Sequence, residues 1–300
     1  MAGKVYFGNT KFQTWIVAPQ SGLNAVASNY NQVTDLLNGR SYVKRSSASA
    51  RKFSASWIGP MNSSDMTSSL QTIKDFADGV YGNENLFWLD PFAIDQNILP
   101  PHWASPGLVS KDWPALSSVT PTTTILAGTS NVYANNFPQT YATYTYAAGS
   151  TSKYIDIIIP SGYYFHFGWH ATASGINGFS NPGFNIIKYS RATNLPVLSG
   201  GLPDFPVSLL AGGTTRTNYS VDGTTYSRVR ITFGLGSSGS TSVVGVIAQI
   251  LPTSTASTGK FISGRGTTAL QFASDINIDY YSSAINNGQI GLSATLIEVD

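Results

Sequence analysis

The fold class is decided by residues 155–169, which read IDIIIPSGYYFHFGW. Isoleucine occupies positions 155, 157 and 159, and after a Pro-Ser-Gly break an aromatic residue occupies positions 163, 165, 167 and 169. An apolar residue at every second position is typical of a strand with one buried face. The stretch therefore predicts two β-strands joined by a short turn.

The same alternation continues downstream. In residues 227–233 it places Val229 and Ile231 on an inward face, and Arg228 and Arg230 on the outward face. A segment of this kind is typical of one sheet of a two-layered β structure, because each strand covers the core with one side only.

Turn signals separate these strands. Asp222-Gly223 and Asn287-Gly288 are residue pairs that two-residue hairpins favour, so each predicts a hairpin turn. Strands that follow one another without helices indicate a β-sandwich. We expect residues 125–300 to form one, with the topology of a jelly roll.

The first part of the chain predicts strands and one helix. Asn38-Gly39 predicts a hairpin turn, and residues 53–57 alternate as a half-buried strand does. Ser63 or Ser64 is suited to cap a helix that Gly79 ends. The apolar stripe of this helix consists of Met66, Leu70, Ile73, Phe76 and Ala77.

Proline marks the expected domain boundary. Residues 100–114 contain repeated prolines among tryptophans, which indicates an extended segment, and residues 117–124 resemble a linker. We therefore expect a mostly β protein with an N-terminal domain at 1–116, a linker at 117–124 and the sandwich at 125–300.

Composition excludes several functions. Seventeen basic and 15 acidic residues give a net charge of +2, so neither half has the basic footprint of a nucleic-acid-binding domain. The absence of cysteine excludes disulfides and thiolate metal sites. We find no signal peptide and no apolar run long enough to insert in a membrane, and expect folding in a cytoplasm. Charged residues make up only 11%, which suits a chain packed into an assembly.

No motif predicts catalysis or a cofactor. Residues 234–239 match the glycine pattern of dinucleotide-binding proteins, but strand-forming residues follow where that motif requires a helix. His166 and His170 on a strand lie about 13 Å apart, too far to share a metal, so we expect no metal site. The carboxylate pairs Asp90/Asp95 and Asp275/Asp279 have turn and strand-face patterns that are not specific to glycosidases. We expect neither an enzyme nor a cofactor.

Two groups of residues remain as candidates for binding. Lys44, Arg45, Arg51 and Lys52 form either a solvated strand pair or a contact with an acidic neighbour in an assembly. A second group suits stacking on a sugar, or equally a hydrophobic core: Tyr133, Tyr141, Tyr144 and Tyr146, with His170 as a further possible ligand contact. These residues leave open the alternative that the protein is a carbohydrate-binding module.

Residues 70–113 resemble the first domain of minor tail proteins from long-tailed phages of actinobacteria, which are similar to the distal tail protein family. The resemblance rests on four motifs: Phe76-x-x-Gly79-x-Tyr81-Gly82, Asp90-Pro91, Asn97-Ile98-Leu99-Pro100 and Trp103-Ala104-Ser105-Pro106. It extends over residues 1–115 and returns in the last thirty or so, where residues 289–299 resemble the end of such proteins.

The resemblance implies a structural virion protein at the tip of a long non-contractile tail. Its first domain would form a homo-hexameric ring that joins the tail tube to the tip hub. The second domain would be a galectin-like or carbohydrate-module-like sandwich that projects outward. The implied partners are other copies of the chain, the tail tube protein, and the tip hub and tape measure proteins of the baseplate. A host-surface glycan is a further possible partner for attachment. The virion would be assembled in the host cytoplasm.

Overall fold

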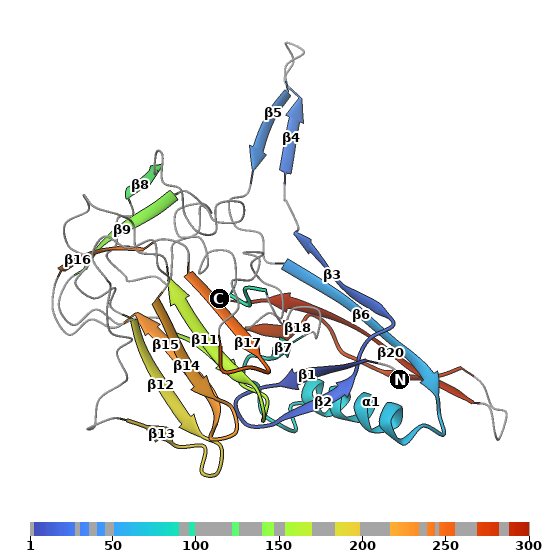
Figure 1. Cartoon of the computed structure of the whole chain (residues 1–300). Coiled ribbons are helices and arrows are strands. Elements are labelled where there is room, and N and C mark those ends of the chain that lie inside the picture. The colour runs from blue at the N-terminus through green and yellow to red at the C-terminus, as the bar shows by residue number, and fades with distance from the viewer. Residues whose placement is uncertain are drawn as a thin grey trace. The chain divides into compact units, whose positions relative to one another are not determined.

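A computed structural model describes residues 3–27, 31–35, 41–45, 51–89, 96–99, 122–125, 140–146, 154–169, 184–198, 217–233, 239–243, 246–255, 269–281 and 288–299. The protein is mostly β, as predicted, and the described part contains a single helix (Figure 1). The chain divides into two compact units, Met1–Leu86 with Ala269–Asp300 and Phe87–Thr268. Each unit is treated separately below.

The first unit contains most of the early strands, the helix and the last three strands. Its elements are β1 (Lys4–Gly8), β2 (Gln13–Val17), β3 (Ser21–Ala27), β4 (Asn31–Asp35), β5 (Ser41–Arg45), β6 (Arg51–Pro60), α1 (Ser64–Ala77), β18 (Leu270–Phe272), β19 (Ile278–Tyr280) and β20 (Gln289–Glu298). β1 pairs with β2, β4 pairs with β5, and the main sheet has the order β18-β20-β6-β3, with β19 also on β20. β4 pairs with β5, and β19 pairs with β20, so the chain reverses between the strands of each pair; the predicted turn residues Asn38, Gly39 and Asn287 lie outside the described residues.

The core of the first unit lies between this sheet and α1. Phe53, Ala55 and Trp57 on β6 are buried, and register places Trp57 opposite Leu292 of β20. The Trp57 Nε1 also donates a hydrogen bond to the Val17 carbonyl of β2 at 2.8 Å. One buried side chain therefore links three strands that lie far apart in the sequence.

Helix α1 forms as its sequence predicts. The buried side of the helix includes Met66, Leu70, Ile73 and Phe76, while Ala77 is half-buried. The Ser63 hydroxyl oxygen accepts a hydrogen bond from the Met66 amide at 3.3 Å, which satisfies a donor that the first turn would leave free. Of the two serines considered as caps, Ser63 is the one that serves.

Replacing Ser63 by alanine is expected to lower the free energy of unfolding by about 1 kcal/mol, because the Met66 amide loses its acceptor. Urea denaturation followed by circular dichroism measures this loss. Ser64→Ala is the matched control, since Ser64 is the first helical residue and its replacement removes no cap. Equal effects of the two substitutions would contradict the assignment of the cap.

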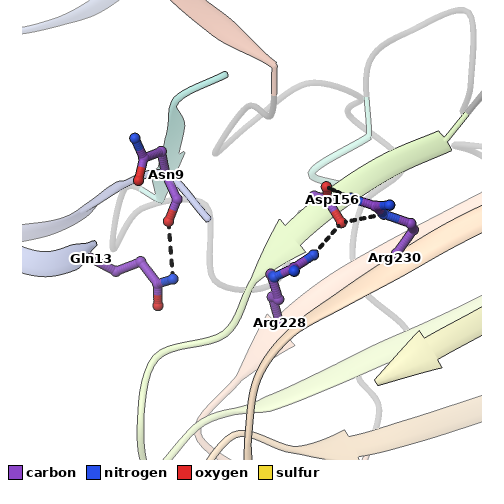
Figure 2. Close-up of polar contacts among 5 residues, drawn as sticks. All are labelled: Asn9, Gln13, Asp156, Arg228 and Arg230. Atoms are coloured by element: carbon purple, nitrogen blue, oxygen red, sulfur yellow. Dashed lines mark hydrogen bonds and ion pairs between the residues drawn. The ribbon is translucent and has the colours of Figure 1, made fainter. Parts of the chain in front are cut away.

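A buried asparagine closes the turn between β1 and β2. The Asn9 Oδ1 accepts hydrogen bonds from the Lys11 and Phe12 amides at 2.9 and 3.0 Å. Its main-chain oxygen accepts a third from the Gln13 Nε2 at 3.0 Å (Figure 2). Asn9 also donates from Nδ2 to the Tyr81 carbonyl at 2.9 Å, which ties the hairpin to the segment after α1.

Within the described residues, the second unit contains three antiparallel sheets. Its elements are β7 (Phe87–Leu89), β8 (Thr122–Ile125), β9 (Thr140–Tyr146), β10 (Tyr154–Ile158), β11 (Tyr164–Trp169), β12 (Phe184–Ser190), β13 (Pro196–Val197), β14 (Thr217–Asp222), β15 (Tyr226–Phe233), β16 (Gly239–Val243) and β17 (Val246–Leu251). The sheet orders are β10-β15-β12-β13, β14-β11-β17 and β16-β9-β8.

The first two of these sheets each have a buried apolar face. In the β10-β15-β12-β13 sheet that face includes Ile157, Val229 and Ile231, and in the β14-β11-β17 sheet it includes Phe165 and Ile250. Most of the predicted inward positions are confirmed, since these residues are buried: Ile155, Ile157, Phe165, Phe167, Val229 and Ile231. Tyr163 is half-buried, and the burial of Trp169 and Phe233 is outside what the structure describes. Two such sheets joined at one end have the features expected of a β-sandwich; the jelly-roll topology stays a prediction.

The predicted hairpin at Asp222-Gly223 is wrong. A turn does occur there, and Asp222 accepts hydrogen bonds from the Thr224 amide and the Thr225 hydroxyl at 2.8 and 3.2 Å. However, β14 pairs with β11, whereas β15 pairs with β10 and β12. The turn therefore carries the chain from one sheet to the other, because turn residues specify a reversal but not the partner of the next strand.

Arg191 stabilises the end of the second unit at which the chain passes from one sheet to the other. Its Nε donates to the Gly223 carbonyl at 2.8 Å, and its Nη2 donates to the carbonyls of Ile159 and Tyr226. Ile159 follows β10 and Gly223 follows β14, so one guanidinium contacts two of the connections between the two sheets, β10 to β11 and β14 to β15.

Replacing Arg191 by lysine is expected to lower the free energy of unfolding by about 2 kcal/mol. A lysine ammonium keeps the charge but lacks the planar fork that reaches three carbonyls in two directions. Thermal unfolding of the full chain measures the effect, with Lys74→Arg on the surface of α1 as a control that should change stability by less than about 0.5 kcal/mol. An unchanged midpoint for Arg191→Lys would contradict the role of the fork.

The segment at residues 96–99 lies along the edge strand β17. Ile98 donates its amide hydrogen to the Ala248 carbonyl at 3.0 Å, and the Asn97 Oδ1 accepts from the Ala248 amide at 3.1 Å. The same Asn97 oxygen accepts from the Leu99 amide at 3.1 Å, and all four residues of the segment are buried. The segment thus covers a sheet edge that would otherwise present free backbone groups.

The two compact units differ from the predicted domains. We expected a boundary at 117–124 and a C-terminal domain that ran to residue 300. Instead, residues 96–99 contact β17 in the second unit, and β20 pairs with β6 in the first over nine register positions from Gln289↔Pro60 to Ile297↔Lys52. The second unit is therefore inserted into the first, and local composition does not reveal this because the β6–β20 pairing is non-local.

Candidate functional site

A cluster of charged and aromatic side chains covers the outer face of the β10-β15-β12 part of the second unit. Register places Asp156 opposite Arg230, and Arg228 opposite Tyr189, and residues directly opposite in antiparallel strands share a face. We name this group the arginine–tyrosine cluster; it consists of Tyr154, Asp156, Tyr189, Arg228 and Arg230.

One carboxylate holds both guanidinium groups of the cluster. Arg230 donates from Nε to Asp156 Oδ1 at 3.0 Å and from Nη2 to Oδ2 at 2.8 Å, which is a bidentate ion pair. Arg228 donates from Nη1 to the same Oδ1 at 2.9 Å. Figure 2 shows the two arginines reaching Asp156 from the neighbouring strand.

Each arginine also lies over a tyrosine ring. The Cζ of Arg228 is 3.3 Å from the ring centroid of Tyr189, and the Cζ of Arg230 is 3.7 Å from that of Tyr154. A guanidinium at this distance is attracted by the negative face of the ring. The rings and the carboxylate therefore fix both guanidinium planes, as pre-organised binding groups require.

The cluster carries an excess of positive charge. Two arginines against one aspartate leave one positive charge, and the hydrogen bonds that Arg230 donates to Asp156 raise the pKa of Arg230 above its usual value. The side chain of Arg228 is only 9% exposed, and its Nε is buried without a hydrogen-bond partner. A buried cation is costly unless an anion balances it, so this face favours negatively charged groups.

The four predicted assembly residues lie near one another in the strand order of the first unit. Register places Lys44 opposite Gln32 and Arg45 opposite Asn31 in the β4–β5 hairpin. It places Arg51 opposite Ala27 and Lys52 opposite Val26 where β3 and β6 pair. The β4–β5 hairpin lies in the chain between β3 and β6, so these four positions are at the ends of the two ladders that are nearest to each other in the chain. Lys52 is exposed.

The predicted sugar-contacting residues fall partly within the described chain. Tyr141, Tyr144 and Tyr146 lie on β9, the middle strand of the β16-β9-β8 sheet. Their register partners are Thr124, Thr241 and Gly239 in that order. Tyr133 and His170 lie outside the described residues. The structure thus brings three of the five onto one strand.

We next consider the residues that the sequence offered as metal ligands or catalytic carboxylates. His166 is buried on β11, and its Nε2 is 2.9 Å from the Thr253 carbonyl oxygen, which makes it a satisfied structural histidine. In the described ranges, no group of three or more histidine or acidic side chains is arranged to hold a metal. Asp275 and Asp279 are exposed, whereas Asp90 and Asp95 lie outside the described residues.

Two further expectations are tested by secondary structure. Residues 239–243 form strand β16, so the glycine-rich stretch at 234–239 does not open a helix and the dinucleotide interpretation is excluded. Across the part of the chain that the structure describes, none of the helices has the length and apolar character to cross a bilayer.

The sequence indicated part of the arginine–tyrosine cluster but not its assembly. Alternation with Val229 and Ile231 places Arg228 and Arg230 on the outer face, and that signal is local. Asp156 joins them only because β10 pairs with β15 in one particular register, which no nearby residue specifies. The sequence does place Asp156 between Ile155 and Ile157, so that its side chain lies on the opposite face of the strand from the isoleucines. This was the available signal that Asp156 could face outward.

Comparison with known proteins identifies no relative. No protein-family model, no curated protein and no solved structure matches this chain.

Proposed function

We propose that this protein is a structural component of the tip of a long non-contractile phage tail, where it forms a homo-hexameric ring without a catalytic centre. The observation that carries the proposal is the β6–β20 pairing, which joins residues 51–60 to residues 289–298 in one sheet. The resemblance to tail proteins is good in the first 115 residues and in the last thirty or so, and vague between them, and β6 and β20 lie within these two parts. Residues 1–86 and the last thirty or so belong to the first compact unit, whereas residues 87–115 belong to the second.

The residues that carry the resemblance also have structural roles in packing, helix termination and hydrogen bonding. Tyr81 stacks on Phe12 with ring centroids 4.4 Å apart and contacts Phe76 at 4.7 Å, so this motif holds the β1–β2 hairpin against the end of α1. Gly79 follows the helix with φ of 77°, a conformation that favours glycine. Asn97, from the third motif, covers the edge of β17. Such residues support a role in assembly.

The expected partners are other copies of the chain, the tail tube protein, and the hub and tape measure proteins of the tip. A closed ring requires a head-to-tail interface, in which one patch of each subunit meets a different patch of the next. The positions of Lys44, Arg45, Arg51 and Lys52 at adjoining strand ends make them our candidates for one of these patches, with an acidic surface as the other. The expected location is the tail tip of the virion.

The test removes the four charges. A variant with glutamine at 44, 45, 51 and 52 is expected to lose the ring in negative-stain images while keeping the circular dichroism spectrum of the native chain. A matched variant with glutamine at Lys4, Lys11, Lys74 and Lys188 removes the same charge elsewhere and should keep the ring. If the variant with glutamine at 44, 45, 51 and 52 still forms rings, these four residues are not part of the interface.

A further inference from the structure

The outer face of the β10-β15-β12 sheet has surplus donors beside an exposed aromatic ring. Asp156 occupies Nε and Nη2 of Arg230 and Nη1 of Arg228. The hydrogen bonds of the described residues leave Nη1 of Arg230 and Nη2 of Arg228 unused. Each guanidinium therefore has a nitrogen left to donate to a further acceptor.

Exposure to solvent increases across the arginine–tyrosine cluster from Arg228 through Arg230 to Tyr154. The side chain of Arg228 is 9% exposed, that of Arg230 is 26% exposed, and Tyr154 is 54% exposed. Arg228 lies between the Tyr189 ring and Asp156, whereas the Tyr154 ring is open to solvent next to Arg230. A bound molecule would thus meet the Tyr154 ring and Arg230 first, with the more buried cation behind them.

The chemistry of these groups selects the ligand. Guanidinium groups bind carboxylates strongly and with defined geometry, and the local surplus of one positive charge requires an anion for balance. The exposed tyrosine offers a flat apolar surface to a ring of similar size, as in sites that combine an aromatic contact with a few polar groups. A free inorganic anion would use the arginines only, whereas an acidic sugar would use both features.

We propose that the arginine–tyrosine cluster binds an acidic saccharide, with the acid group at Arg230 and Arg228 and the sugar ring against Tyr154. This inference goes beyond the proposed ring and does not depend on it. It also places a saccharide site on residues other than those of β9. A solution test of ligand binding and an image of the ring are separate measurements, so either proposal can fail alone.

Saturation-transfer NMR on the full chain tests the proposal with glucuronate, glucose and inorganic phosphate as probes. We expect saturable transfer to the ring protons of glucuronate and at least about tenfold weaker binding of glucose, because glucose lacks the charge that the arginines select. Phosphate should compete with glucuronate for the arginines but bind more weakly, because it leaves Tyr154 uncovered.

Variants locate the site. Arg230→Gln and Tyr154→Ala change partly exposed side chains and should each weaken glucuronate binding by about tenfold or more. Lys188→Gln removes a charge from the same sheet, where Lys188 lies opposite Val229 on the other face, and should leave binding unchanged. Tyr280→Ala, at a tyrosine that is 69% exposed in the first unit, should also leave it unchanged.

Three results would overturn the proposal. Glucuronate that shows no saturable binding, or binds no better than glucose, would leave the cluster as an ion-pair network without a ligand. Phosphate that binds as tightly as glucuronate, with both unaffected by Tyr154→Ala, would show a simple anion site. Equal losses in the Lys188 and Arg230 variants would show that general charge, not the cluster, attracts the probe.

Discussion

Replacing Gly223 by alanine is expected to destabilise the second unit by about 4 kcal/mol or more. A Cβ at this position would lie 2.4 Å from the Pro160 carbonyl oxygen and 2.5 Å from that of Tyr163. Both are backbone atoms, so the chain itself must shift rather than a side chain. The shift would disturb the hydrogen bond from the Gly223 amide to the Tyr163 carbonyl, at 2.7 Å, and the one from Arg191.

Thermal unfolding of the full chain measures this effect, and a fall of roughly 10 °C in the transition of the second unit is expected. Gly162→Ala is the matched control, because it makes the same change in the neighbouring connection. Gly162 has φ of 80° but nothing within 4 Å of its added Cβ, so only backbone strain of about 1 kcal/mol is expected. Equal effects would show that the two connections are not packed as described.

Replacing Trp57 by alanine is expected to cost the first unit about 4 kcal/mol or more. Trp57 is 1% exposed, so its removal leaves a large cavity between β6, β20 and α1. The Val17 carbonyl also loses its partner, the Trp57 Nε1, which adds the cost of an unsatisfied buried acceptor. The unit should then unfold at a much lower denaturant concentration, as measured by urea titration.

Two further variants separate the causes. Trp57→Phe keeps most of the buried ring but removes the donor, and should cost about 2 kcal/mol. Trp15→Ala removes a tryptophan that is 36% exposed on the neighbouring strand β2, and should cost about 1 kcal/mol. A Trp57→Ala variant no less stable than Trp15→Ala would contradict the placement of Trp57 in the core.

Local features of this fold could be predicted from local sequence. The cap at Ser63 depends on a hydroxyl next to a free amide, and the burial of Trp57 follows from alternation within five residues of one strand. The hairpin formed by β4 and β5 follows from a turn-forming pair between two short strands. In each case the residues that determine the structure lie close together in the sequence.

Features that depend on distant pairing could not be predicted. Prolines between residues 100 and 114 suggested a boundary after them, yet Asn97 already belongs with β17 and β20 returns to β6. The same limit explains the error at Gly223, where the turn was predicted but its destination was not. The site was affected in the same way: both arginines were placed on a face, but their shared partner Asp156 was not foreseen.

Our proposal that this chain forms a closed ring can be tested by measuring the mass of the protein in solution. We would measure the purified protein by light scattering over increasing concentration and image the same samples by negative stain. We expect a particle of six copies with a six-fold ring in projection. A strict monomer at every concentration, with no ring in the images even when purified tail tubes are added, would contradict it.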